Sequence, residues 1–118
     1  MNDVMVNGGG DDDGFKNLHT MVEVDKVSNF YVIKNKRTGD VLLEVQMQKG
    51  VVPVAGVNGV TIEDLLFIAI QELDIHASGP FQCKETSEAL VNVNRALGWL
   101  ISRTRNRVAR GVEGKELV

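Results

Sequence analysis

The chain has 118 residues, of which 43% are hydrophobic and 25% are charged, and its formal net charge is −3. That length suits one domain with a core of its own. The acidic balance argues against general binding to nucleic acid, because domains that bind it are usually basic. The one cysteine, Cys83, cannot form an internal disulfide, which favours a reducing compartment.

The N-terminal residues 1–20 predict a mobile leader. They include a run of glycines, Gly8–Gly10, and a run of acids, Asp11–Asp13. Such a composition cannot bury enough apolar area to offset its ordering entropy. The acids lack the alternating spacing and closing Glu of a calcium loop, so we expect no metal and no cofactor. The start has no apolar signal region, and the longest apolar stretch, Leu65–Ile70, is too short for a bilayer, so no membrane contact is expected.

Residues 21–60 have the pattern of an antiparallel sheet. Phe30–Ile33 is a short apolar strand, and Met21–Val24 is expected to add a strand at one edge. A further strand is expected where apolar residues alternate with polar ones, at Leu43, Val45 and Met47. Gly39 lies between these strands and supplies the positive φ that a hairpin needs. The Val-rich segment 51–57 contains Pro and Gly, which predicts strand and turn in preference to helix.

The periodicity becomes helical at Thr61. Thr61 and Asp64 have the spacing of a capping box, and the helix is expected to reach Ile75. A second helix should begin between residues 83 and 86 and end at Arg110, before a glycine. The sequence therefore predicts an α+β fold, in which an N-terminal antiparallel sheet or hairpin precedes a C-terminal hairpin of two helices.

These elements give one expected domain over residues 21–118. Its sheet part covers residues 21–60, its helical hairpin covers residues 61–110, and residues 111–118 form a tail. The second helix would be about 40 Å long, which exceeds what one small core needs. We therefore expect a homodimer formed through this helix, whose apolar stripe consists of Leu90, Val93, Leu97, Leu100, Thr104 and Val108.

The second helix also carries a cationic stripe. Five arginines and no acidic residue occur from Arg95 to Arg110. At about 100° per residue, four of them fall within roughly 120° of the helix, and Asn92 and Trp99 share that stripe. The four arginines are Arg95, Arg103, Arg107 and Arg110. Guanidinium forks beside an amide and a large aromatic suit a phosphate-bearing ligand with a flat base.

Two other interpretations of this stripe remain open. Cations near a helix C-terminus are favoured by the helix dipole and often form a solvated face. Against that, like charges four residues apart destabilise a helix unless an anion binds them. Trp99 is also compatible with a core or interface position. No motif links Cys83 to His19 or His76, so no catalytic site is expected.

Several segments carry a resemblance to a known family. They are Asn29-Phe30-Tyr31, Asn35-Lys36-Arg37-Thr38-Gly39, Gly56-Val57-Asn58-Gly59-Val60, Gly79-Pro80-Phe81-Gln82-Cys83, Ala96-Leu97-Gly98-Trp99-Leu100 and the run from Arg103 to Gly114. Together they resemble the phage Thoeris anti-defence family, whose C-terminal helical hairpin is similar to that of phage anti-CBASS sponge proteins. The resemblance covers residues 29–114, and its most specific part is the run from Arg103.

The resemblance implies a protein of the host cell cytoplasm that is not an enzyme and that sequesters nucleotide second messengers. Its implied ligand is a cyclic ADP-ribose isomer made by TIR-domain enzymes, whose capture keeps the NAD-degrading Thoeris effector inactive. Some relatives also hold cyclic di- or trinucleotides in a hexamer built from dimers. The resemblance thus implies a cyclic nucleotide as ligand and a homodimer, or a trimer of such dimers, as the assembly.

The resemblance also assigns roles to individual residues. It implies Phe81 for base stacking, Asn92 for a polar contact, and Arg103, Arg107 and Arg110 for phosphates. Arg95 and Trp99 complete the candidate set through the helical stripe. Lys84 stands where the family pattern has Arg, and a Lys there would weaken a bidentate grip on phosphate.

Two alternative functions follow from the same residues. A small regulator could place the arginine helix on nucleic acid, because a local cationic patch can bind it. An enzyme that cleaves the cyclic nucleotide would need a general base near the ligand, and the basic stripe supplies none.

Overall fold

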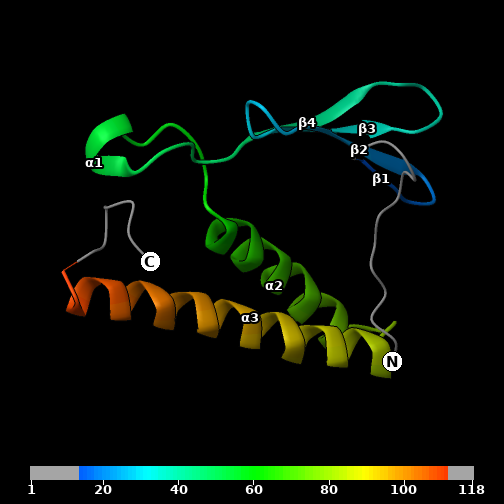
Figure 1. Ribbon diagram of the computed structural model, residues 1–118. Helices are drawn as coiled ribbons and strands as arrows, with labels where there is room; N and C mark the ends of the chain where they lie inside the picture. Colours follow the sequence, from blue (N-terminus) through cyan, green and yellow to red (C-terminus); the bar gives the residue numbers. More distant parts are fainter. Residues whose placement is uncertain (1–13, 112–118) are drawn as a thin grey trace. The chain divides into compact units, whose positions relative to one another are not determined.

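A computed structural model describes residues 14–111 of the chain. Most of the predicted leader and tail, residues 1–13 and 112–118, lies outside the described residues. The chain divides into two compact units (Figure 1). Of the described residues, the sheet unit comprises residues 14–50 with Val57–Gly59, and the helical unit comprises Val51–Gly56 with residues 60–111.

The sheet unit contains four antiparallel strands in the order β1-β2-β3-β4. They are β1 (Phe15–Lys16), β2 (Thr20–Asp25), β3 (Phe30–Asn35) and β4 (Val41–Gln46). Gly39 has a φ of 79° in the turn between β3 and β4, as predicted. The α+β class is therefore confirmed.

The strand β1 lies within the predicted leader, so that prediction is wrong for residues 15–20. Phe15 pairs with Val22, and Lys16 pairs with Met21. Phe15 brings an aromatic side chain to the sheet, and a two-residue strand gains its hydrogen bonds from a neighbour that is already in place. The Gly- and Asp-rich composition that predicted mobility ends before this residue.

The segment Val57–Gly59 closes against the end of β4. The Asn58 side chain accepts from the backbone N–H of Lys49 (2.9 Å) and donates to its carbonyl (2.8 Å), which replaces a missing strand partner. A Cβ on Gly59 would lie 2.5 Å from the carbonyl oxygen of Gln46. No larger residue fits there without moving backbone, which accounts for the Gly at this position.

The helical unit opens with a short helix, α1 (Val52–Ala55). The prediction of strand and turn for residues 51–57 is therefore wrong. Pro53 lies in the first turn, where its fixed φ suits a helix and its missing N–H costs nothing. Gly56 ends the turn with a φ of 75°. These two local constraints outweigh the strand preference of the valines.

The helices α2 (Ile62–Ser78) and α3 (Lys84–Ala109) form the predicted hairpin. The capping box is confirmed: Thr61 Oγ1 accepts from Asp64 N at 3.1 Å, and Asp64 Oδ2 accepts from Thr61 N at 2.9 Å. α2 continues past its predicted end at Ile75 as far as Ser78. α3 begins within its predicted range, and Gly111 follows its end with a φ of 73°.

The two helices pack along one stripe each. Their half-buried positions repeat at intervals of three and four residues, and those of α3 include Leu90, Val93, Leu97, Leu100 and Thr104, as predicted. Val108 was predicted to continue this stripe, but it is 60% exposed, whereas Arg107 is only 7% exposed. Arg107 lies seven residues after Leu100, about two full turns, so it extends the stripe more directly than Val108 does.

Two glycine substitutions test these packing assignments. Gly59→Ala should lower the free energy of unfolding by about 1–3 kcal/mol, because its Cβ meets backbone atoms. Gly98→Ala should raise it by about 0.5–1 kcal/mol, since a Cβ at that helical position meets nothing within 4 Å. Urea unfolding followed by circular dichroism measures both. Unchanged stability of the Gly59 variant would contradict the close approach.

Candidate functional site

A cavity of about 280 Å³ lies on the C-terminal part of α3. It is lined by Trp99, Ser102, Arg103, Asn106, Arg107 and Arg110. These positions are separated by steps of three and one, so they occupy one face of the helix over about three turns. The structure therefore brings four of the predicted ligand residues to one concave surface: Trp99, Arg103, Arg107 and Arg110.

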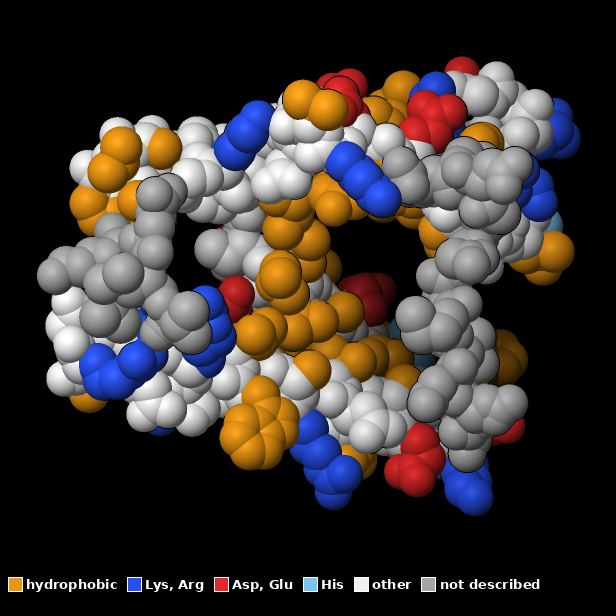
Figure 2. Space-filling model, viewed as in Figure 1, with side chains coloured by type: hydrophobic (Ala, Val, Ile, Leu, Met, Phe, Trp, Pro, Cys, Tyr) orange, Lys and Arg blue, Asp and Glu red, His pale blue; other side chains and the backbone are white. Residues whose placement is uncertain are grey.

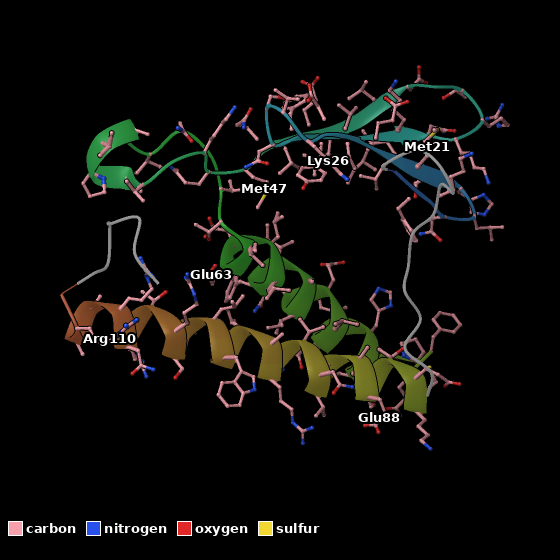
Figure 3. The ribbon with its side chains drawn as sticks, viewed as in Figure 1. Met21, Lys26, Met47, Glu63, Glu88 and Arg110 are labelled. Atoms are coloured by element: carbon pink, nitrogen blue, oxygen red, sulfur yellow. The ribbon has the colours of Figure 1, made fainter. Side chains whose placement is uncertain are left out.

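The cavity lies where α3 extends beyond its partner helix α2. α3 has 26 residues and α2 has 17, so α3 is longer by roughly 14 Å. The hairpin turn joins the end of α2 to the start of α3, which leaves the C-terminal turns of α3 beyond the start of α2 (Figure 1). Arg110 marks this end of the helix, and Glu88 lies near the opposite end (Figure 3).

The other three predicted residues lie outside the cavity. Phe81 is 85% exposed in the turn between the helices. The Asn92 side chain donates to the carbonyl of Glu88 at 2.9 Å, within its own helix. Arg95 lies one turn before Trp99. Phe81 precedes Arg107 by nearly the whole of α3, about 35 Å along the axis, so the two cannot meet on a small ligand within one copy.

The arginines of the cavity differ in their surroundings. The Arg103 side chain is exposed and makes no hydrogen bond or ion pair with residues 14–111. Arg107 is buried, and both Arg107 and Arg110 have interaction partners in the structure. No acidic side chain belongs to the described lining of the cavity. The cavity is therefore cationic, and Arg103 is an exposed guanidinium within it.

The helix dipole accounts for only part of this arrangement. It favours cations within the last turn of a helix, where Arg107 and Arg110 lie near the C-terminal end. Its effect falls off before Arg103, and it gives no reason for an aromatic side chain beside the cations. Trp99 is 76% exposed, so it is not a core residue of the hairpin. The dipole alone therefore does not explain the site.

Two polar residues of the cavity were not among the sequence candidates. The Ser102 hydroxyl and the Asn106 amide make no hydrogen bond with the described residues, so both are available to a ligand. They lie three and seven residues after Trp99, on the helical face that the arginines share. The same spacing argument that selected the arginines identifies them once polar side chains are included.

The cysteine lies away from this cavity. Cys83 precedes α3, and its Sγ lies 3.2 Å from Oγ1 of Thr86. Within residues 14–111, neither histidine is hydrogen-bonded to this thiol. No group of His, Cys, Asp and Glu in the same range is placed to hold a metal ion. None of the helices described there is both long and apolar enough to cross a membrane.

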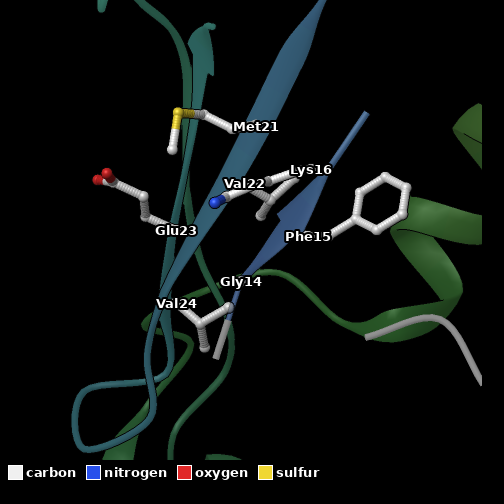
Figure 4. A pocket seen from close by; sticks show the side chains of 7 residues that line it. All are labelled: Gly14, Phe15, Lys16, Met21, Val22, Glu23 and Val24. Atoms are coloured by element: carbon white, nitrogen blue, oxygen red, sulfur yellow. The ribbon is translucent and has the colours of Figure 1, made fainter. Parts of the chain in front are cut away.

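A second cavity, of about 200 Å³, belongs to the sheet unit. It is lined by Gly14, β1 and residues of β2, with Lys16 and Glu23 among the side chains around it (Figure 4). One cation and one anion beside apolar strand residues give it no charge preference. None of the predicted ligand residues lies there, whereas four of them line the cavity on α3, which is therefore taken as the candidate site.

No protein-family model matches the chain. The chain is 41% identical over 73 residues to Thoeris anti-defense 1 of Bacillus phage SBSphiJ7. The matched segment covers 62% of this chain and 51% of that relative, so the chain spans about half the length of the protein that it matches. This identity supports the resemblance to the Thoeris anti-defence family.

Proposed function

We propose that this chain counters Thoeris defence by capturing a cyclic nucleotide signal in the host cytoplasm. The proposed ligand is a cyclic ADP-ribose isomer made by a TIR enzyme, and a cyclic oligonucleotide is a further candidate. Captured ligand would not reach the Thoeris effector, which would stay inactive. The observation that carries the proposal is the cationic cavity with an exposed aromatic wall, in a chain related to a phage anti-defence protein.

The chemistry of the cavity fits such a ligand. A pyrophosphate carries two negative charges, and each charge-assisted hydrogen bond to a guanidinium contributes about 1.5–3 kcal/mol. A base stacked on an aromatic side chain adds about 1–3 kcal/mol. Three or four such contacts reach nanomolar affinity after the entropy of association is subtracted. An effective competitor of a signalling receptor needs affinity in that range.

The same side chains favour holding the ligand over cleaving it. Arginine stays protonated and cannot act as a general base at neutral pH. A serine nucleophile needs an adjacent base, and the residues that line the cavity supply none. Binding without turnover suits a protein that withdraws a signal from its receptor.

We further propose that the protein acts as a homodimer or a larger assembly, with the interface on the outer side of α2. The predicted interface on α3 is less suitable, because Leu97 and Leu100 belong to the stripe that packs in the hairpin. α2 instead leaves Leu65, Ile68 and Ile75 exposed on one flank. Figure 2 shows apolar side chains gathered over α2 and cationic ones over the C-terminal part of α3. The trimer of dimers remains a prediction from the family resemblance.

A second copy could also bring residues from the two ends of the hairpin to the same ligand. Phe81 and Arg107 lie about 35 Å apart along α3 in one copy. In a two-fold assembly of antiparallel hairpins, the turn of one copy approaches the cationic end of the other. A ligand contact by Phe81, as the family resemblance implies, would then come from that second copy.

Isothermal titration calorimetry tests the proposed ligand class. Titration with a panel of cyclic ADP-ribose isomers and cyclic oligonucleotides should give saturable heat for at least one cyclic nucleotide, with submicromolar affinity. Duplex DNA and RNA should give no retention in a mobility-shift assay at moderate salt. Retention of nucleic acid without heat from any cyclic nucleotide would favour the alternative, a nucleic-acid-binding regulator.

A matched pair of arginine variants tests the cavity. Arg103→Ala should weaken binding about 10- to 150-fold, because it removes an accessible guanidinium from the lining. Arg105→Ala removes the same charge from a position outside the lining and should have a much smaller effect. Both side chains are exposed, so folding should be preserved in each. Equal losses would mean that net charge attracts the ligand and that this cavity does not.

A negative charge introduced on the exposed flank of α2 tests the proposed interface between copies. Ile68 is 61% exposed, so Ile68→Glu should split the assembly without disturbing the hairpin. Gln71→Glu adds the same charge at another exposed position of α2 and should leave the assembly intact. Sedimentation velocity measures the mass, and circular dichroism checks the helix content. A wild-type monomer at micromolar concentration would contradict the proposed assembly.

A further inference from the structure

The side chain of Asn58 closes the base of the loop of residues 50–57, which contains α1. Its Oδ1 accepts from the backbone N–H of Lys49 at 2.9 Å, and its Nδ2 donates to the Lys49 carbonyl at 2.8 Å. The backbone N–H of Asn58 donates to Oε1 of Gln48 at 3.1 Å. These three hydrogen bonds form the Asn58 clasp. None of its residues lines the cavity on α3.

The fold imposes two requirements on neighbouring positions here. The clasp needs an amide at position 58, because a carboxylate could not donate to the Lys49 carbonyl. The next position needs glycine, since a Cβ on Gly59 would lie 2.5 Å from the carbonyl oxygen of Gln46. Together they produce an Asn-Gly dipeptide. A glycine puts no Cβ beside its backbone nitrogen, which leaves that nitrogen free to approach the preceding side chain.

The reaction open to this dipeptide is deamidation through a cyclic imide. The backbone nitrogen of Gly59 forms a bond to Cγ of Asn58, and the bond from Cγ to Nδ2 breaks. Nδ2 leaves as ammonia with the proton that the Gly59 nitrogen loses. Water then breaks one of the two bonds from the ring nitrogen to a carbonyl carbon, which gives aspartate or isoaspartate. Asn58 is exposed, so solvent reaches its amide.

The clasp opposes the first step of this reaction. The attack requires the Asn58 side chain to turn so that Cγ approaches the Gly59 nitrogen, and a side chain held at both Oδ1 and Nδ2 cannot turn freely. Two hydrogen bonds of ordinary net strength correspond to a reactive, open state that is about 5- to 150-fold less populated than in an unfolded chain. Such local opening does not require the whole chain to unfold.

We propose that Asn58 is a site of spontaneous deamidation, that the closed clasp slows the reaction, and that the modification opens the base of the α1 loop permanently. An aspartate at this position would direct an oxygen at the Lys49 carbonyl in place of a donor. An isoaspartate would also lengthen the backbone by one carbon beside Gly59, where even a Cβ has no room. Neither product can re-form the clasp.

Peptide mapping by mass spectrometry of the full chain, aged in mildly alkaline buffer, measures the reaction. The sequence has two Asn-Gly dipeptides, Asn7-Gly8 and Asn58-Gly59. Both should deamidate at similar rates in concentrated guanidinium chloride, which removes the clasp. In buffer, Asn58 should react about 5- to 150-fold more slowly than it does in the denaturant. Equal rates of Asn58 in the two conditions would overturn the role of the clasp, and no reaction in the denaturant would overturn the site.

Two variants separate the clasp from the overall stability of the chain. Gln48→Ala removes the acceptor of the Asn58 N–H and should accelerate deamidation of Asn58 in buffer about 2- to 12-fold. Thr61→Ala breaks the capping box of α2, outside the clasp, and should leave the rate unchanged. Equal acceleration in both would place the reaction in the unfolded chain, and that result, or no acceleration in Gln48→Ala, would overturn the proposal. Circular dichroism checks that each variant folds.

A matched pair of variants tests the consequence of the modification. Asn58→Asp imitates the aspartate product and should speed hydrogen exchange of the Lys49 amide about 2- to 12-fold. Asn94→Asp makes the same change at an exposed asparagine of α3, whose Nδ2 donates to the Leu90 carbonyl, and should leave that amide unchanged. Unchanged exchange of Lys49 in Asn58→Asp would overturn the opening of the loop.

Discussion

The difference in length between the two helices of the hairpin determines where the candidate site lies. α2 covers α3 along one stripe, but α3 has 26 residues against 17, so its last turns have no partner within the hairpin. An uncovered amphipathic helix end would normally be shortened or neutralised. Here it carries Arg103, Arg107 and Arg110, which line the cavity together with Trp99.

The candidate site is cationic, although the chain as a whole is acidic. The net charge of −3 limits non-specific attraction to nucleic acid, while the local cluster retains a strong field for a small anion. A concave site of about 280 Å³ is on the scale of a small-molecule ligand and does not follow a duplex. Both properties suit the proposed capture of a small anionic signal in the presence of abundant nucleic acid.

Local signals in the sequence predicted most of the fold. The capping box at Thr61, the positive φ of Gly39 and the glycine after α3 each act through neighbouring atoms, so the residues alone define them. The predictions were wrong where the composition of a segment indicated one structure and a particular residue or a pairing with another strand produced a different one. Pro53 and Gly56 turned a Val-rich segment into α1, and pairing with β2 ordered Phe15 inside a segment predicted to be mobile.

The candidate site was only partly predictable for a related reason. A helical wheel orders residues around an axis but not along it, so it grouped Asn92 and Arg95 with residues that lie several turns further on. The position of the cavity depends on where α2 ends relative to α3, which is a tertiary property. Near the end of α3, Arg107 is buried and the predicted Val108 is exposed, an exchange that the helical wheel did not predict.

Mass spectrometry of bound ligand tests the proposal that the chain withdraws a cyclic nucleotide from solution without altering it. The protein would be incubated with an extract of cells whose TIR enzyme is active, washed, and denatured by heat to release what it holds. We expect the released material to be an intact cyclic ADP-ribose isomer, or another intact cyclic nucleotide, in near-stoichiometric amount. Recovery of a linear, hydrolysed product, or of no nucleotide at all, would contradict it.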